Sequence, residues 1–146
     1  MAQTYKASNN VTYSCKYHLV WTPKYRRKVL TGEIAERLKA IITEVAAETG
    51  SEVLSMEVMP DHVHLLADVD PSLGAMKFVR LCKGRSSRLL RQEFPQLKSR
   101  LPTLWTNSTF LSTVGGAPLS VVKQYIVKQY IENQQRSEPR PKKSNG

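Results

Sequence analysis

The stretch EVLSMEVMPDHVHLLADV, residues 52–69, decides the fold because it holds two strand-like runs on either side of a turn. Residues 52–59 and 62–69 are both rich in apolar side chains, and the dipeptide Pro60-Asp61 between them is typical of a tight turn. We therefore predict that the two runs pair as an antiparallel hairpin.

His62 and His64 stand two positions apart in the second run. Side chains at i and i+2 of a strand project from one face, so both imidazoles share a face while Val63 points to the other. Two imidazoles placed in this way can hold one cation between them. A bare His-x-His pair is a weak motif, and two ordinary strand histidines are the alternative. An apolar strand disfavours that alternative, because a buried imidazole without hydrogen bonds is costly.

The sequence before the hairpin contains one strand pattern and one helix pattern. Residues 11–21 (VTYSCKYHLVW) are rich in aromatic and β-branched residues and predict a strand. Residues 33–49 carry apolar side chains at helical spacing and predict a helix. Gly50 follows this run directly and is a typical C-terminal stop.

The sequence after the hairpin continues with a helix, a strand and a further helix. The first helix is expected to begin after residues 70–72, with Ser72 as its N-cap. Residues 109–114 predict a strand, Gly115-Gly116 a hinge, and residues 118–135 a last helix with proline in its first turn. The order β-α-β-β-α-β predicts an α+β fold of the ferredoxin-like split βαβ type, with a four-stranded antiparallel sheet and an added C-terminal helix.

Positive charge is the first functional clue in the composition. The chain has 22 Lys and Arg against 12 Asp and Glu, a formal net charge of +10, which favours nucleic acid as a partner. Four of these residues lie in one cluster near the N-terminus, and six lie on the second long helix, where Lys77, Arg80, Arg88 and Arg91 share one stripe opposite the apolar side chains. A solvated surface is the alternative for such runs. The candidate DNA-binding residues are Lys24, Arg26, Arg27, Lys28, Lys77, Arg80, Lys83, Arg85, Arg88 and Arg91.

The length of 146 residues fits a single domain, which we place at residues 1–136, followed by a flexible basic tail at residues 137–146 (SEPRPKKSNG). No run approaches the eighteen apolar residues of a membrane span, and the N-terminus lacks a signal core, so a cytoplasmic location is expected. Cys15 and Cys82 are expected to be separate, reduced core residues.

Five stretches resemble one family in content and in order. They are YHLVWTPKYRR (residues 17–27), DHVHLL (61–66), KGRSSRLLRQEFP (83–95), TVGGAPLSVVKQYI (113–126) and YIENQ (130–134). The family is the single-tyrosine HUH transposases, the TnpA-type enzymes of small bacterial and archaeal insertion sequences. The resemblance covers residues 13–135.

The resemblance implies an enzyme that moves single-stranded DNA. In this family a tyrosine attacks the scissile phosphate, leaving a covalent 5′-phosphotyrosine and a free 3′-hydroxyl that strand exchange later resolves. The resemblance also implies a homodimer, recognition of hairpins near the ends of the element, and a divalent ion, Mg²⁺ or Mn²⁺. A glutamine four residues after the tyrosine is implied to join His62 and His64 in the metal site, because these ions prefer a hard oxygen ligand.

Two tyrosines fit the resemblance, because the segment SVVKQYIVKQYIENQQ contains VKQYI twice. Tyr125 is followed by Gln129 and Tyr130 by Gln134. Five residues of a helix turn a side chain by about 140°, so only one tyrosine can face a given site. The string YIENQ favours Tyr130, whereas the interval of eleven residues after Val114 favours Tyr125. We give the interval more weight and take Tyr125 and Gln129 as site residues, with Tyr130 and Gln134 as the alternative.

Two other functions compete with a transposase. One is a non-catalytic, ferredoxin-like protein that binds single-stranded nucleic acid on its sheet. It predicts aromatic platforms on the central strands, and residues 56–69 offer none. The other is a phosphoesterase that uses His62, His64 and a metal-activated water. A covalent protein–DNA adduct separates the transposase from both.

Overall fold

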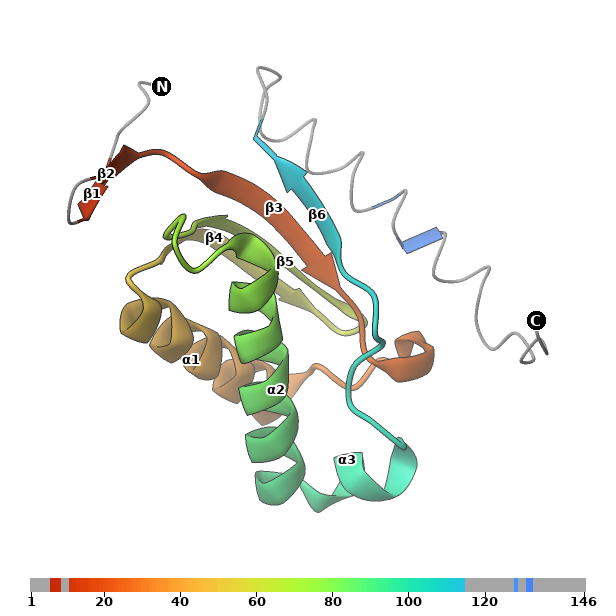
Figure 1. Ribbon diagram of the computed structural model, residues 1–146. Helices are drawn as coiled ribbons and strands as arrows, with labels where there is room; N and C mark the ends of the chain where they lie inside the picture. Colours follow the sequence, from red (N-terminus) through yellow and green to blue (C-terminus); the bar gives the residue numbers. More distant parts are fainter. Residues whose placement is uncertain (1–5, 9–10, 115–127, 129–130, 133–146) are drawn as a thin grey trace, which may run out of the picture.

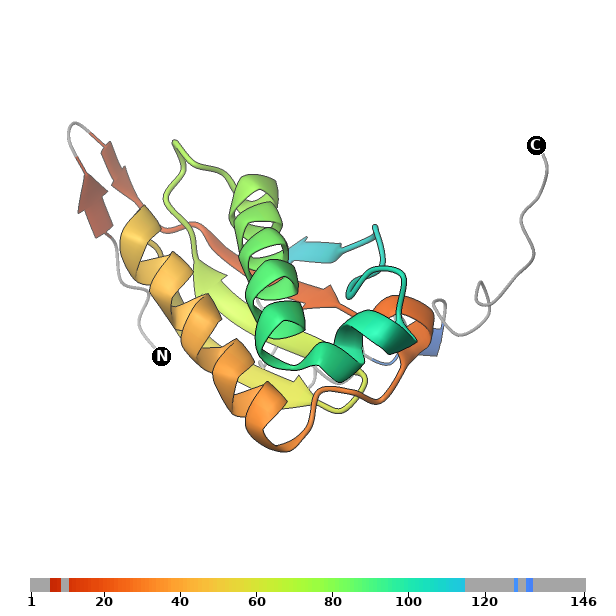
Figure 2. The same cartoon turned by 90° about the horizontal axis from the view of Figure 1, so that it is seen from below.

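The computed structural model describes residues 6–8, 11–114, 128, 131 and 132. Four strands form one antiparallel sheet: β3 (Lys16–Trp21), β4 (Glu52–Met59), β5 (His62–Asp68) and β6 (Phe110–Thr113). Their order in the sheet is β4-β5-β3-β6. Two long helices, α1 (Gly32–Thr49) and α2 (Ala75–Glu93), lie together on one face of this sheet (Figures 1 and 2). This arrangement confirms the predicted ferredoxin-like α+β fold.

The hydrophobic core lies between the sheet and the two helices. Alternate residues of the central strands point into it, as the period of two in a strand requires. Burying each large aliphatic or aromatic side chain contributes about 1.5–3 kcal/mol, so this layer accounts for much of the stability. Core residues include Leu19 and Trp21 from β3, Val63, Leu65 and Ala67 from β5, Leu38, Ile41 and Ile42 from α1, and Phe78, Val79 and Cys82 from α2.

The hairpin and α1 match the sequence-based expectations closely. β4 and β5 pair with Met59 opposite His62, and a register shift occurs between Val53 and Ser55. α1 ends at Thr49, and Gly50 follows in the left-handed conformation with φ of 72°. A glycine adopts this conformation without the steric cost that a Cβ atom would bring.

The start of α2 corrects the expectation that Ser72 is its N-cap. Ser72 donates its backbone N–H and its hydroxyl to Oδ1 of Asp70, at 2.8 and 2.7 Å. The carboxylate therefore holds Ser72 in a turn before the helix. α2 begins at Ala75, and Gly74, with φ of 90°, occupies the N-cap position.

The predicted strand at residues 11–21 is divided in two. β2 (Val11–Tyr13) pairs with β1 (Lys6–Ser8) in a separate two-stranded sheet, and β3 begins only at Lys16. The interruption has a tertiary cause, because the N–H of Cys15 donates to Oδ1 of Asp68 at 3.0 Å. The carbonyl of Cys15 in turn accepts the N–H of Val69 at 2.9 Å.

A short helix, α3 (Pro95–Arg100), follows α2 and was not expected from the sequence. Its proline stands in the first turn, where the missing N–H has no cost. Of the expected helix at residues 118–135, only residues 128, 131 and 132 are described, and they are helical. The expected tail at residues 137–146 lies outside the described residues.

The two cysteines are both free thiols, as expected, with Cys82 buried and Cys15 half-buried. Burial raises the pKa of the Cys82 thiol to about 12, which keeps it protonated. Among the described helices, none has the length and apolar character needed to cross a membrane.

Candidate functional site

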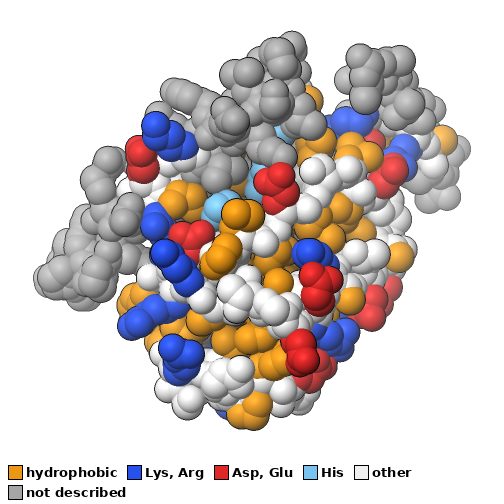
Figure 3. All heavy atoms as spheres, turned by 180° about the vertical axis from the view of Figure 1, so that it is seen from behind, with side chains coloured by type: hydrophobic (Ala, Val, Ile, Leu, Met, Phe, Trp, Pro, Cys, Tyr) orange, Lys and Arg blue, Asp and Glu red, His pale blue; other side chains and the backbone are white. Residues whose placement is uncertain are grey.

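His62 and His64 lie on the face of the sheet opposite α1 and α2. On β5, Val63, Leu65 and Ala67 belong to the buried core, so the alternating histidines project from the other face. Figure 3 shows histidine side chains on this face of the molecule. The two histidines therefore share one face, as the sequence predicts.

Asp61 holds the ring of His62 through one carboxylate oxygen. Nδ1 of His62 lies 2.9 Å from Oδ1 of Asp61, and only 14% and 16% of the two side chains are exposed. An ionised carboxylate can only accept hydrogen bonds, so Nδ1 of His62 carries the proton. This bond holds the ring at Nδ1 and leaves Nε2 as the atom that faces away from Asp61, the usual arrangement of a histidine that binds a metal ion.

Arg26 connects the same carboxylate to the C-terminal part of the chain. Its Nε lies 3.1 Å from Oδ2 of Asp61, and its Nη1 donates to the carbonyl of Ile131 over 3.2 Å. Arg26 ends the short 3-10 turn η1 (Lys24–Arg26), where Tyr25 and Arg26 have φ of 58° and 51°. Such conformations cost non-glycine residues about 1–3 kcal/mol each and concentrate at functional sites.

His18 is a third histidine on this face, and no local sequence pattern marks it as a site residue. Its Nδ1 lies 3.1 Å from Nε2 of His64, and the two rings stack with centroids 5.3 Å apart. Both side chains are buried, with 1% and 3% exposed. One of these nitrogens donates a hydrogen to the other, so His18 fixes the position of His64. The contact could be found only from the β3–β5 register, in which Val20 lies opposite His64.

The described residues contain the two expected histidine ligands but not a complete metal site. Within residues 6–8, 11–114, 128, 131 and 132, no three His, Cys, Asp or Glu side chains are grouped so as to hold an ion. The expected site residues Tyr125, Tyr130, Gln129 and Gln134 lie outside the described part of the chain. The ring of His62, held at Nδ1 by Asp61, fits a cation as its partner at Nε2.

The basic cluster after β3 lines a cleft. Arg26, Arg27 and Lys28 form one wall, Arg100 at the end of α3 lies on the other, and the cleft volume is about 560 Å³. No acidic residue is among the described residues that line it. The sequence does not mark Arg100 as a site residue, because no local pattern predicts the turn that brings α3 beside the cluster. Lys24 lies outside this lining and is 5.5 Å from the ring centroid of Tyr25.

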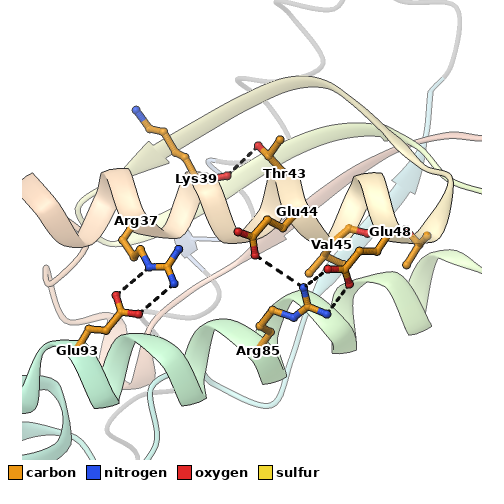
Figure 4. A network of polar contacts seen from close by, with 9 residues as sticks. Arg37, Lys39, Thr43, Glu44, Val45, Glu48, Arg85 and Glu93 are labelled. Carbon is orange, nitrogen blue, oxygen red and sulfur yellow. Dashed lines mark hydrogen bonds and ion pairs between the residues drawn. The ribbon is translucent and has the colours of Figure 1, made fainter.

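The six candidate basic residues of α2 divide into exposed and internally paired residues. Lys77, Arg80 and Arg88 are exposed on the helix side of the sheet, opposite the histidines. Arg85 instead forms a two-bonded ion pair with Glu48 of α1 at 2.9 and 2.6 Å, as Figure 4 shows.

Lys83 and Arg91 also have partners within the protein. Lys83 donates to the carbonyl of Ser108 and the hydroxyl of Thr109 at 3.0 and 3.2 Å. Its burial lowers the pKa of the ammonium group to about 8. Arg91 donates to the carbonyls of Leu101 and Pro102. These three basic side chains, Lys83, Arg85 and Arg91, therefore already support the packing of α2.

Sequence comparison finds close relatives among known proteins. The model of the family described as "Transposase IS200 like" matches residues 11–134. The ISDra2 transposase TnpA of Deinococcus radiodurans is 42% identical over 127 residues, covering 86% of this chain and 91% of that protein. The transposase of the insertion sequence element IS200 from Salmonella typhimurium is 30% identical over 130 residues, covering 88% and 85%.

Solved structures give the same picture. A crystal structure of a Deinococcus radiodurans protein assigned as a transposase superimposes with a TM-score of 0.76 at 39% identity, covering 88% of this chain and 97% of that chain. A REP-associated tyrosine transposase bound to a REP hairpin has a TM-score of 0.55 at 14% identity, covering 89% and 74%. At that identity the second similarity shows the fold alone.

Proposed function

Because the chain belongs to the IS200-like transposase family, we propose that it cleaves and rejoins single-stranded DNA at insertion-sequence ends through a covalent 5′-phosphotyrosine. The observation that carries this proposal is the pair His62 and His64 on the face of the sheet opposite α1 and α2, with Asp61 orienting the ring of His62. The REP-associated tyrosine transposase is bound to a hairpin, which supports a DNA hairpin as the partner. We also propose a homodimer, and Mg²⁺ or Mn²⁺ as the ion.

The residues of this chain have distinct roles in such a reaction. His62 and His64 would hold a divalent ion, which when bound neutralises charge on the nonbridging oxygens of the scissile phosphate. The phenolic oxygen of the tyrosine bonds to phosphorus while the bond to the 3′-oxygen breaks and its electron pair leaves with that oxygen. A phenol has a pKa of about 10, so its proton must be lost on attack, while the departing oxygen gains one. Attack of a 3′-hydroxyl on the phosphotyrosine reverses these steps and rejoins the strand.

The identity of the nucleophile depends on how the C-terminal segment docks. The interval after the last strand favours Tyr125. The contact between Arg26 and the carbonyl of Ile131 favours Tyr130, because Tyr130 directly precedes Ile131 whereas Tyr125 is six residues away, about 9 Å along a helix. We give the contact more weight, because it is a contact of this structure, whereas the interval has meaning only through the family resemblance. We therefore propose Tyr130 with Gln134, and keep Tyr125 with Gln129 as the alternative.

The two basic surfaces have different positions relative to the histidines. Arg26 lines the cleft together with Arg27, Lys28 and Arg100, and it also bonds to Asp61 beside His62. We propose that the cleft holds phosphates of the strand near the point of cleavage. Lys77, Arg80 and Arg88 lie on the far side of the sheet, so we propose that they contact the same DNA outside the cleavage point, at its hairpin.

A covalent adduct is the direct test of this function. Single-stranded oligonucleotides that tile the DNA on both sides of the coding sequence should include one that reacts with the protein in Mg²⁺ or Mn²⁺. The expected result is a protein–DNA complex that survives denaturation in detergent and disappears when the ion is chelated. Binding without any adduct would favour the non-catalytic protein, and cleavage that leaves a free 5′-phosphate and no adduct would favour the phosphoesterase.

Removing a phosphate contact should weaken DNA binding and also its dependence on salt. Arg27→Ala and Arg88→Ala are each expected to reduce the slope of log affinity against log salt by about one ion, because each lost contact leaves one counterion unreleased. Titrations of a labelled hairpin at several salt concentrations measure both quantities. Arg37→Ala is the matched control, since it removes an equal charge from a side chain that pairs with Glu93. Equal slopes for all three variants would assign Arg27 and Arg88 to the solvated surface.

A further inference from the structure

Three contacts in series connect the C-terminal segment to the proposed metal-binding histidine. The carbonyl of Ile131 accepts from Nη1 of Arg26 at 3.2 Å, Nε of Arg26 lies 3.1 Å from Oδ2 of Asp61, and Oδ1 of Asp61 lies 2.9 Å from Nδ1 of His62. The four residues come from three separate parts of the chain. They meet at the turn between β4 and β5, where β5 begins.

We propose that Arg26 is a positioning residue that couples docking of the tyrosine-bearing segment to the orientation of His62, with Asp61 as the connection. This inference rests on the proposed function, which makes His62 a metal ligand and gives the segment that contains Ile131 the nucleophilic tyrosine. It assigns Arg26 a role inside the active site in addition to any contact with DNA. A properly docked segment and a properly oriented metal ligand then support each other.

The guanidinium group is well suited to this role. It is planar and rigid, so a bond at Nε fixes the direction in which Nη1 can donate. A lysine ammonium at the same position could pair with Asp61 but would not hold a fixed direction toward Ile131. The carboxylate of Asp61 uses a separate oxygen for each neighbour, so moving the guanidinium changes the position of the oxygen that holds His62.

Burial and backbone geometry distinguish this ion pair from the surface pair of Arg37 and Glu93. The side chains of Arg26 and Asp61 are 19% and 16% exposed, whereas those of Arg37 and Glu93 are 32% and 38% exposed. The backbone at Tyr25 and Arg26 has positive φ, which is unfavourable for these residue types. The turn is held in place by Lys24, whose N–H donates to the carbonyl of Leu104 at 2.8 Å.

A thermodynamic coupling of this kind must act in both directions. In the full-length wild type without DNA, Mn²⁺ binding should slow hydrogen exchange of the backbone at residues 128–132. Asp61→Ala should weaken Mn²⁺ binding by about 10- to 100-fold, the usual effect of removing a group that orients a metal ligand. Arg26→Ala should weaken it as well, and the double variant should be no worse than Asp61→Ala, because both changes break one series of contacts.

Arg26→Lys separates the coupling from simple charge. It should retain most of the Mn²⁺ affinity, because a cation still pairs with Asp61, but the slowing of exchange at residues 128–132 by Mn²⁺ should be lost. This variant keeps the charge and is the safer choice if Arg26→Ala does not fold. Arg37→Ala, which breaks the Arg37–Glu93 pair, should leave both the Mn²⁺ affinity and the exchange response unchanged.

Isothermal calorimetry with Mn²⁺ alone and hydrogen-exchange mass spectrometry measure these effects, and neither needs a cleaved substrate. If Arg26→Lys keeps the exchange response, or if the wild type shows no Mn²⁺ binding or no response, the coupling is overturned. The function is judged separately by the wild-type adduct. An active transposase with an unresponsive segment would therefore reject the coupling and retain the enzyme.

Discussion

His62→Ala and His64→Ala are each expected to lower the rate of covalent adduct formation by at least about 100-fold while hairpin binding is mostly retained. The large loss follows because each histidine would hold the ion that stabilises charge on the phosphate in the transition state, where one missing stabilising group costs two to three orders of magnitude. Binding depends instead on the basic surfaces, which neither change touches.

The two variants should differ in stability. Comparing them therefore separates a loss of folding from a loss of chemistry. His64 is 3% exposed and lies 3.1 Å from His18, so His64→Ala removes a buried hydrogen bond and should lower the free energy of unfolding by about 1–3 kcal/mol. His62, the first residue of β5, is bonded to Asp61 and is 14% exposed, so His62→Ala should cost less. Single-turnover adduct assays at a temperature where both variants are folded measure the rates. Wild-type rates in both variants would remove His62 and His64 from the chemistry.

Elements with a local sequence signal agree best with the structure. Residues 52–59 form β4 with the predicted bounds, because a turn and an apolar run define this strand without any distant contact. α1 ends at the residue before Gly50, since the left-handed conformation after the helix depends on that residue alone. For the same reason, the shared face of His62 and His64 follows directly from the period of a strand.

The differences arise where a distant side chain takes part. Asp68 accepts the N–H of Cys15 and ends the strand pattern of residues 11–21, although the residues themselves favour a strand. Asp70 similarly holds Ser72 in a turn, so a good capping residue does not cap. In both cases a carboxylate near the end of β5 overrides a local preference.

The candidate site also depends on contacts between residues that are distant in the sequence. His18 reaches His64 only through the pairing of β3 with β5, and a sequence gives the strands without their order. Arg26 reaches Asp61 because Tyr25 and Arg26 adopt positive φ, which no local pattern at tyrosine or arginine predicts. The sequence shows the basic residues as a group. It does not show which of them are exposed and which are paired, because the pairing depends on contacts with α1 and with residues 101–109.

The repeated VKQYI leaves two candidate nucleophiles that can be separated by removing one hydroxyl at a time. Tyr130 and Tyr125 differ by about 140° in direction on an intact helix, so a single docking of that helix presents only one of them to an ion at His62 and His64. The described anchor of this segment is the carbonyl of Ile131, the last residue of the second copy, which Arg26 binds. We propose that docking through that anchor presents the second copy to the ion.

Tyr130→Phe is therefore expected to eliminate the covalent adduct, and Tyr125→Phe to leave it, because phenylalanine removes the nucleophilic hydroxyl and keeps the packing of the ring. By the same argument, Gln134→Ala should reduce Mn²⁺ affinity and Gln129→Ala should not, since the glutamine one turn after the nucleophile faces the same site. Mass spectrometry of the DNA-linked peptide, prepared on a single-stranded substrate that releases its leaving strand, identifies the tyrosine directly. DNA on Tyr125 would show that the interval after Val114, and not the Arg26–Ile131 contact, sets the docking. It would reverse the assignment of nucleophile and glutamine while keeping the class of enzyme.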